Sequence, residues 1–248
     1  MPDTHGGNIF KFSHDHKINL SEVTDFSANI NLLGPSPKGL EALNERLRYI
    51  SHYPDVTNDD VMNTIADVYG IEKDSILLGN GAAELLYAVG RLSGFTGAFV
   101  PAPGFSEYQA SMDAANIPVR EIFYRQRQND DGTPYFEVPY LALQTFAAEL
   151  KGQDGRIIVF LGNPNNPDGT LLDKQSIKVL AQMLKDANSL LVIDESFIDF
   201  IGNESLRDNS HSMRELINQY DNVIIVHSFT KFYAVPGLRI GAVFANPT

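Results

Sequence analysis

Residues 190–195 read Leu-Leu-Val-Ile-Asp-Glu, and residues 223–231 read Val-Ile-Ile-Val-His-Ser-Phe-Thr-Lys. Each stretch begins with four consecutive apolar residues, as expected for a strand that is buried on both faces. Polar residues follow at once, which places Asp194 and Lys231 just beyond the ends of two strands. Because ligands of open parallel sheets bind outside the carboxyl ends of the strands, Asp194 and Lys231 are candidate site residues.

The same alternation of short apolar runs and helical stretches extends over the chain from Ser75 onward. It predicts an α/β fold of three layers, α/β/α, around a mainly parallel sheet. The expected strands cover residues 76–78, 97–101, 157–161, 190–193, 223–228 and 241–245. The expected helices cover residues 83–92, 105–115, 141–150, 174–187 and 213–220. The polar stretch 126–139 is expected to be a loop or the tip of a β-hairpin.

The first fifty residues follow a different pattern, in which glycines and prolines interrupt short apolar pieces. Such punctuation predicts an arm and loops, with a helix at 38–49. The apolar spacing at 58–69 predicts a second, amphipathic helix. We therefore expect residues 1–50 to form an N-terminal arm and part of a small domain, and residues 51–248 to form the large domain.

Composition narrows the class of partner. The chain has 248 residues, 43% of them hydrophobic, with 19 basic against 31 acidic residues and a net charge of −12. This charge gives no electrostatic reason to bind nucleic acid or an anionic membrane, so a small molecule is the expected partner. No apolar run approaches the roughly 20 residues of a membrane span, and no signal peptide is recognisable. We therefore expect a cytoplasmic protein.

Cysteine usage and histidine spacing narrow the chemistry. The chain contains no cysteine, which excludes disulfides and thiolate chemistry. The histidines of His14-Asp15-His16 have no further ligand group beside them, so we expect no metal site.

Lys231 and Asp194 each have an ordinary and a chemical interpretation. A lone strand-end aspartate is usually a helix cap or an ion-pair partner, and a lone lysine is usually solvated. However, apolar and cationic neighbours lower the pKa of a lysine and free its amine to attack an aldehyde. Arg239 is a candidate for that cation and for a phosphate clamp, and the hydroxyls of Ser228 and Thr230 are candidate anion ligands.

Three further segments stand at predicted strand ends. The turn at 79–84 could hold a phosphate on backbone amides, but glycines there also suit plain packing. The loop at 163–169, Asn-Pro-Asn-Asn-Pro-Asp-Gly, has an unusual composition, and Asn166 could donate to a phenolate oxygen if the loop is more than a turn. Phe105 could stack on a heteroaromatic ring or belong to the core.

The loop at 163–169, Asp-Glu-Ser-Phe at 194–197, Ser-Phe-Thr-Lys at 228–231 and Arg239 together resemble the fold-type I pyridoxal-5′-phosphate (PLP) enzymes, the aspartate aminotransferase superfamily. The resemblance implies that Lys231 forms the Schiff base with PLP, that Asp194 pairs with the pyridine nitrogen and that Asn166 bonds the ring 3-oxygen. It implies a homodimer. The remaining cofactor contacts that it implies are Gly81, Ala82, Ala83, Ser228 and Arg239 around the phosphate, Phe105 and Phe197 at the ring, and Tyr53 on the phosphate of the partner subunit.

Within this superfamily, the segments 5–8, 25–31, 103–108 and 231–239 are similar to threonine-phosphate decarboxylases of cobalamin synthesis. That resemblance implies decarboxylation of L-threonine O-3-phosphate to (R)-1-amino-2-propanol O-2-phosphate. Histidinol-phosphate or related amino acid aminotransferases are the alternative, although they usually carry Tyr at the position of Phe197 and lack the His-Gly-Gly-Asn segment. The implied substrate contacts are His5, Asn8, Asn31 and Gly34.

Relatives continue beyond the position equivalent to Thr248 with a small domain that supplies substrate-binding arginines. We therefore expect this C-terminal small domain to be missing from the chain. A second alternative is thus a PLP-binding module without a catalytic role.

Overall fold

The computed structural model describes residues 6–138, 140–141, 143–145, 155–202 and 205–247. In these ranges the chain forms a seven-stranded sheet with the order β1-β9-β8-β7-β6-β2-β3. Its strands are β1 (Ile76–Gly79), β2 (Phe95–Ala102), β3 (Val119–Phe123), β6 (Arg156–Gly162), β7 (Leu190–Asp194), β8 (Val223–Ser228) and β9 (Gly241–Ala245). Neighbours from β3 to β8 are parallel, and β9 is antiparallel to both β8 and β1. The prediction of a mainly parallel sheet is confirmed.

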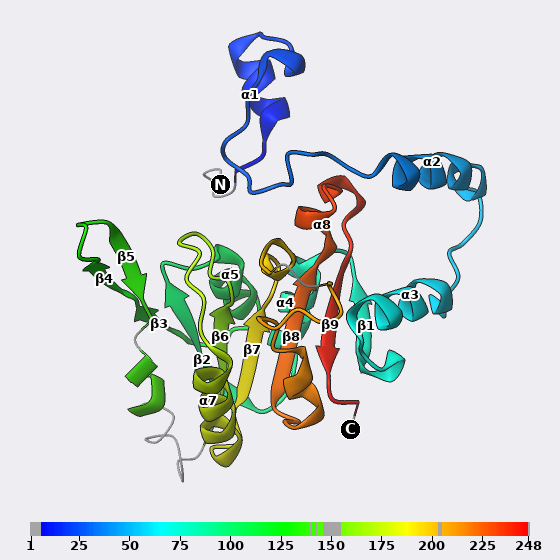
Figure 1. The fold of residues 1–248 in the computed structure, drawn as a ribbon. Coiled ribbons are helices and arrows are strands. Elements are labelled where there is room, and N and C mark those ends of the chain that lie inside the picture. Colours follow the sequence, from blue (N-terminus) through cyan, green and yellow to red (C-terminus); the bar gives the residue numbers. More distant parts are fainter. Residues whose placement is uncertain (1–5, 139, 142, 146–154, 203–204, 248) are drawn as a thin grey trace.

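Helices cover both faces of this sheet (Figure 1). One face packs against α4 (Ala82–Gly90) and α5 (Ser106–Ala114), and the other packs against α3 (Asp59–Tyr69) and α7 (Lys174–Asp186). Both faces of the sheet are apolar because side chains alternate along each strand. In β6, Ile158 and Phe160 face α4 and α5, whereas Ile157, Val159 and Leu161 point to the opposite side. The three-layer α/β/α arrangement is confirmed, and β8 leads directly into the short helix α8 (Phe229–Phe232).

The N-terminal arm stands away from the sheet (Figure 1). It contains α1 (Ile9–His16) and α2 (Pro37–Arg46). The expectation of irregular chain was wrong for α1, because Asn8 accepts a hydrogen bond from the Lys11 amide and Lys11 pairs with Asp15 one turn later at 2.9 Å. No residue of α1 is buried. The boundary between residues 1–50 and 51–248 stays a prediction.

The other elements agree with the predictions except in two places. The stretch 126–139 contains the expected hairpin, β4 (Arg125–Gln128) and β5 (Pro134–Glu137). Strand β3 was not predicted, since this edge strand is partly exposed and carries charged Arg120 and Glu121 in place of an apolar run. The helix expected at 213–220 is a 3₁₀ helix, because its apolar spacing of three residues fits both helix types. Of the helix expected at 141–150, residues 142 and 146–150 lie outside the described ranges.

Short 3₁₀ helices complete the described elements: Leu20–Glu22, Leu47–Tyr49, Lys73–Ser75, Ile198–Phe200, Arg214–Asn218 and Pro236–Leu238. Among the residues that the structure describes, no helix has the length and apolar character that crossing a bilayer requires.

Candidate active site

A cavity at the carboxyl ends of β7 and β8 gathers residues that are distant in sequence. Asp194 ends β7, Ser228 ends β8 and Lys231 lies in α8. All the predicted cofactor residues except Gly81 and Tyr53 line this cavity. The full lining is Ala82, Ala83, Phe105, Tyr108, Pro164, Asn166, Asp194, Ser196, Phe197, Ser228, Thr230, Lys231 and Arg239.

The Asp194 carboxylate is held in one orientation. It is 6% exposed, and each of its oxygens has a donor: the Tyr108 hydroxyl at 2.9 Å from Oδ2 and the Ser196 amide at 2.9 Å from Oδ1. Burial raises the pKa of Tyr108 well above its usual range, and the charge of Asp194 raises it further, so the phenol stays a donor. The carboxylate therefore presents a fixed negative charge to the cavity.

The role of Tyr108 was not recognised from the sequence. The signal was present, since Phe105 and Tyr108 are three residues apart at the start of α5 and such residues share a helix face. The Tyr108 ring also stacks on Phe160 with centroids 5.2 Å apart. This stacking anchors the phenol in the core beneath Asp194.

Lys231 lies in surroundings that favour its neutral amine. Burial lowers the pKa of Lys231, and the positive charge of Arg239 lowers it further, whereas Asp194 acts in the opposite direction. A lysine with a lowered pKa carries more free amine near neutral pH and is a better nucleophile. The structure thus agrees with the lowered pKa that the sequence predicted.

The lining of the cavity also carries a positive charge, that of Arg239. Gly81 caps α4 with φ +84°, a backbone conformation that favours glycine, and a Cβ there would lie 2.5 Å from Arg239 Nη2, which places the guanidinium beside this turn. The first amides of α4 have no hydrogen-bond partners within the helix, and they lie at the helix end that carries the positive end of the dipole. The Ser228 hydroxyl, 2.7 Å from Thr230 Oγ1, adds a further polar group. This donor set suits an anion.

Replacing Arg239 tests the electrostatics of Lys231. In Arg239→Gln the neighbouring positive charge is lost, so the pKa of Lys231 rises toward its usual range and less free amine is present at a given pH. We expect the pH midpoint for acetylation of Lys231, followed by peptide mass spectrometry, to move upward. Arg91→Gln, at the far end of α4, should leave it unchanged. An unchanged or lower midpoint in Arg239→Gln would contradict this account.

The predicted substrate residues are distributed unevenly. Asn31 lies against residues 231–233, which we call the lysine turn. Its amide donates to the Lys231 carbonyl at 3.1 Å, and its side chain donates to the Phe232 carbonyl at 2.9 Å. Gly34 ends a separate turn that begins at Asn31, because the Gly34 amide donates to the Asn31 carbonyl at 3.2 Å. Tyr53 is fully exposed and does not line the cavity. His5 lies outside the described residues.

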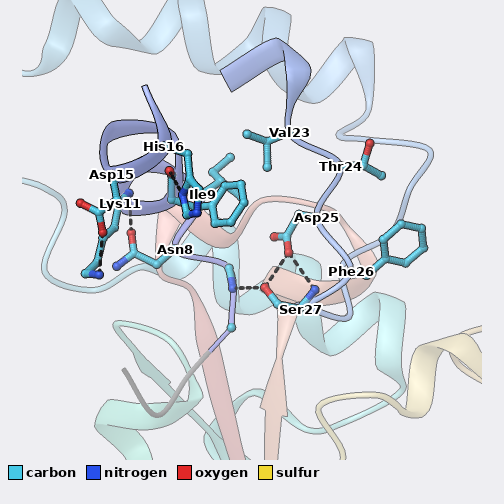
Figure 2. A pocket seen from close by; sticks show the side chains of 13 residues that line it. Asn8, Ile9, Lys11, Asp15, His16, Val23, Thr24, Asp25, Phe26 and Ser27 are labelled. Atoms are coloured by element: carbon cyan, nitrogen blue, oxygen red, sulfur yellow. Dashed lines mark hydrogen bonds and ion pairs between the residues drawn. The ribbon is translucent and has the colours of Figure 1, made fainter. Parts of the chain in front are cut away.

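Asn8 lies in a different hollow, of about 560 Å³, between α1 and residues 23–27 (Figure 2). Its side chain caps α1, and on the facing segment the Ser27 hydroxyl donates to Asp25. The structure therefore brings Asn31, but not Asn8, to Lys231 of the same chain. The substrate roles of these residues remain predictions.

A second space adjoins the Lys231 cavity. It measures about 370 Å³ and shares Pro164, Asn166 and Phe197 with that cavity. Its other lining residues are Asn29, Ile30, Asn165, Pro167, Gly169, Phe200 and Ile201, so its described lining has no charged side chain. The space suits the uncharged part of a small ligand that reacts at Lys231.

The two kinds of charge in the lining indicate the ligand that the Lys231 cavity suits. Arg239, Ser228 and the α4 amides match an anionic group, Asp194 matches a protonated nitrogen, and the Phe105 and Phe197 rings suit a flat aromatic body between them. A neutral lysine amine beside that body can attack a carbonyl carbon. These groups are the ones that a phosphorylated pyridine aldehyde requires.

Comparisons with known proteins agree with this geometry. Residues 21–248 match the family described as aminotransferase class I and II. The chain is 36% identical over 247 residues to an adenosylcobalamin biosynthesis bifunctional protein of Leptospira interrogans, covering 98% of this chain and 26% of that protein. It is 32% identical over 242 residues to a threonine-phosphate decarboxylase of Salmonella typhimurium, covering 96% and 60%.

A solved structure agrees as well. The histidinol-phosphate aminotransferase from Clostridium acetobutylicum superposes with a TM-score of 0.74 at 27% identity, covering 90% of this chain and 61% of that one. The chain thus spans 26% to 61% of the lengths of these three proteins.

Proposed function

The chain belongs to the aminotransferase class I and II family of PLP-dependent enzymes, and from this premise we propose that it acts on a small phosphorylated amino acid at Lys231. Its cofactor is PLP. One observation carries the proposal: Lys231, Asp194 and Arg239 line a single cavity with an anion-binding end and a carboxylate end.

We assign the contacts to PLP from this lining. Arg239, Ser228 and the amides of Ala82 and Ala83, together with the amide of the adjoining Gly81, would hold the phosphate, Asp194 would hold the ring nitrogen and Asn166 the 3-oxygen. Phe105 and Phe197 contact the ring, and Tyr53 serves the partner subunit. When bound, PLP supplies an electron sink for charge that develops at the α-carbon of an amino acid.

The side chains of the protein perform the remaining tasks. Asp194, fixed by Tyr108 and Ser196, keeps its negative charge facing the ring nitrogen. Lys231 binds the cofactor through its amine and, once released, moves a proton at the α-carbon of the substrate. Asn31 holds the lysine turn, and His5, Asn8 and Gly34 are the further substrate contacts that we propose.

The reaction that we propose is decarboxylation of L-threonine O-3-phosphate to (R)-1-amino-2-propanol O-2-phosphate. Its support is the 32% identity to a protein named threonine-phosphate decarboxylase and the segments at 5–8 and 231–239. Histidinol-phosphate aminotransferase is the second candidate, which the structural superposition favours. The residues that orient the substrate would decide between them, because its orientation selects whether the carboxylate or the proton of the α-carbon is lost.

A two-substrate assay separates these functions. The purified chain, loaded with PLP, is incubated with L-threonine O-3-phosphate, or with histidinol phosphate plus 2-oxoglutarate. We expect carbon dioxide and aminopropanol phosphate from the first mixture, detected by mass spectrometry. Glutamate from the second mixture would favour the aminotransferase. PLP binding with neither product would favour a non-catalytic PLP-binding module.

We propose a homodimer, with the arm as part of the contact. The arm exposes large apolar side chains: Leu32 is 95% exposed, Leu33 93% and Phe26 92%. Exposed apolar patches of this kind mark interaction surfaces. A cytoplasmic location remains a prediction from the sequence.

Leu32→Ser with Leu33→Ser tests the contact. Burying one leucine contributes about 1.5–3 kcal/mol, so we expect self-association at least about tenfold weaker by analytical ultracentrifugation. Leu141→Ser, at a residue that is 75% exposed outside the arm, serves as the control. A wild-type chain that stays monomeric at every concentration would count against the dimer.

A further inference from the structure

Four buried or half-buried polar side chains meet behind the turn that carries Lys231. Tyr69 is the last residue of α3, Asp199 lies in the 3₁₀ turn after β7, His227 belongs to β8, and Tyr233 follows α8. We propose that Tyr69, Asp199, His227 and Tyr233 form a positioning network, which holds Lys231 in place relative to Asp194. The proposal builds on the role of Lys231 proposed above.

The contacts of the positioning network are continuous. His227 Nε2 lies 3.1 Å from Asp199 Oδ2, and both side chains are almost fully buried, at 1% and 4% exposure. The Tyr69 hydroxyl donates to the same Asp199 oxygen at 2.8 Å and lies 3.1 Å from the Tyr233 hydroxyl. One carboxylate oxygen and one hydroxyl thus join four separate segments.

The positioning network lies on the face of the sheet opposite the cofactor cavity. Side chains alternate along β8, so that Val226 packs toward α4 and α5, whereas His227 packs against the rings of Tyr69 and Phe229, each 4.9 Å away between centroids. None of its four members lines the Lys231 cavity. They act on Lys231 through the backbone and not by touching the ligand.

The network ties together the two segments that matter for the site. Asp199 follows Asp194 in the chain by five residues, and His227 precedes Lys231 by four. The Asp199–His227 pair therefore links the segment that carries the ring-nitrogen partner to the segment that carries the amine. The backbone reinforces this link, because the Glu195 amide donates to the Val226 carbonyl at 2.8 Å.

Stability alone is a poor explanation for so many buried polar groups. Replacing a buried polar or ionic pair by well-packed apolar residues is often neutral or stabilising, so stability does not account for the contact between His227 and Asp199. Burial acts to raise the pKa of Asp199, but the hydrogen bonds from His227 and Tyr69 outweigh it and lower that pKa. Arg214, with Cζ 5.0 Å from the Tyr69 ring centroid, adds a positive charge nearby. The network keeps a charged carboxylate behind the site.

The lysine turn is thereby held from two sides. Asn31 of the arm bonds the carbonyls of Lys231 and Phe232. On the other side, the Tyr233 hydroxyl contact to Tyr69 connects the turn to α3. Loss of that contact should let the turn relax toward solvent. Lys231 would then lose part of its burial and of its proximity to Arg239, the two causes of its lowered pKa.

The test uses Tyr69→Phe, Tyr233→Phe and the double variant, each of which removes only hydroxyl groups. The chain without cofactor is acetylated across a pH series, and the labelling of Lys231 is followed by peptide mass spectrometry. We expect each single variant to raise the pH midpoint by about half a unit to one unit. The double variant should equal Tyr69→Phe, because the contact between the two hydroxyls that Tyr233→Phe removes is already lost in Tyr69→Phe. Tyr135→Phe, in the exposed hairpin, should behave as wild type.

Each outcome separates positioning from a purely structural role. A structural role would lower the melting temperature without moving the midpoint, and that result in both single variants would overturn the proposal. Additive midpoint shifts in the double variant would also overturn it. If Tyr69→Phe fails to fold, Tyr233→Phe, at a residue that is 37% exposed, decides alone. Borohydride mapping of wild-type chain with PLP is independent of these midpoints, so failure of the proposed function is seen separately.

Discussion

Lys231→Ala will leave the chain folded and abolish covalent attachment of PLP. After incubation with PLP and reduction with borohydride, wild-type chain will carry a pyridoxyl group on the peptide containing residue 231, and the variant will carry none there. The reason is chemical: Lys231 is the lysine that lines the cavity with Asp194 and Arg239, and its lowered pKa favours the attacking amine.

The fold should survive this change because Lys231 is only half-buried and lies beyond the end of β8. Circular dichroism and thermal unfolding check that point. Lys178→Ala, which removes a lysine of α7 paired with Glu215, is the matched control and should be labelled at residue 231 like wild type. Borohydride-stable attachment of PLP to the Lys231→Ala chain at the wild-type level would refute the assignment of the amine.

Asp194→Ala is expected to have the second largest effect. It removes the negative charge that faces the ring nitrogen and leaves the buried Tyr108 hydroxyl without its acceptor. Truncating one partner of a buried, hydrogen-bonded charge pair costs about 2–5 kcal/mol. PLP affinity, measured by equilibrium dialysis, should therefore fall by at least about 30-fold.

Two further variants separate charge from hydrogen bonding. Asp194→Asn keeps the size of the side chain, and its oxygen can accept from the Ser196 amide while its NH2 group donates to the Tyr108 oxygen, but it removes the charge. We therefore expect it to lose turnover as Asp194→Ala does, with a smaller loss of folding stability. Tyr108→Phe removes the hydroxyl and keeps the charge, so it should cost less than either. If Asp194→Ala bound PLP and turned over substrate like wild type, the proposed role of Asp194 as partner of the ring nitrogen would be wrong.

The sheet was predictable because its strands obey a simple rule. Strands β6, β7 and β8 are buried on both faces, and such strands must be apolar at nearly every position. Edge strand β3 does not follow this rule and was not predicted, since its exposed positions accept charged residues. Helix α1 was not predicted for a related reason. A local cap and an ion pair stabilise it, and it has no buried face that would give a periodic pattern of apolar residues.

The residues of the candidate site could be predicted where polar residues directly follow the ends of strands. Asp194, Ser228, Lys231 and Arg239 fall into one cavity, as the resemblance implied. Tyr108 was harder to assign, because its partner lies 86 residues away in sequence. The positioning network was not foreseen either. Its contacts are long-range, and each member looks like an ordinary core or surface residue until the fold brings the four together.

The close approach of Gly81 to Arg239 also restricts how this sequence can change over generations. A single added methyl group at residue 81 would overlap the guanidinium, and the φ of +84° already disfavours any side chain there. A residue other than glycine at position 81 would therefore have to adopt a strained backbone and displace the end of the Arg239 side chain. The φ of +84° keeps position 81 restricted to glycine even in a lineage that changes residue 239.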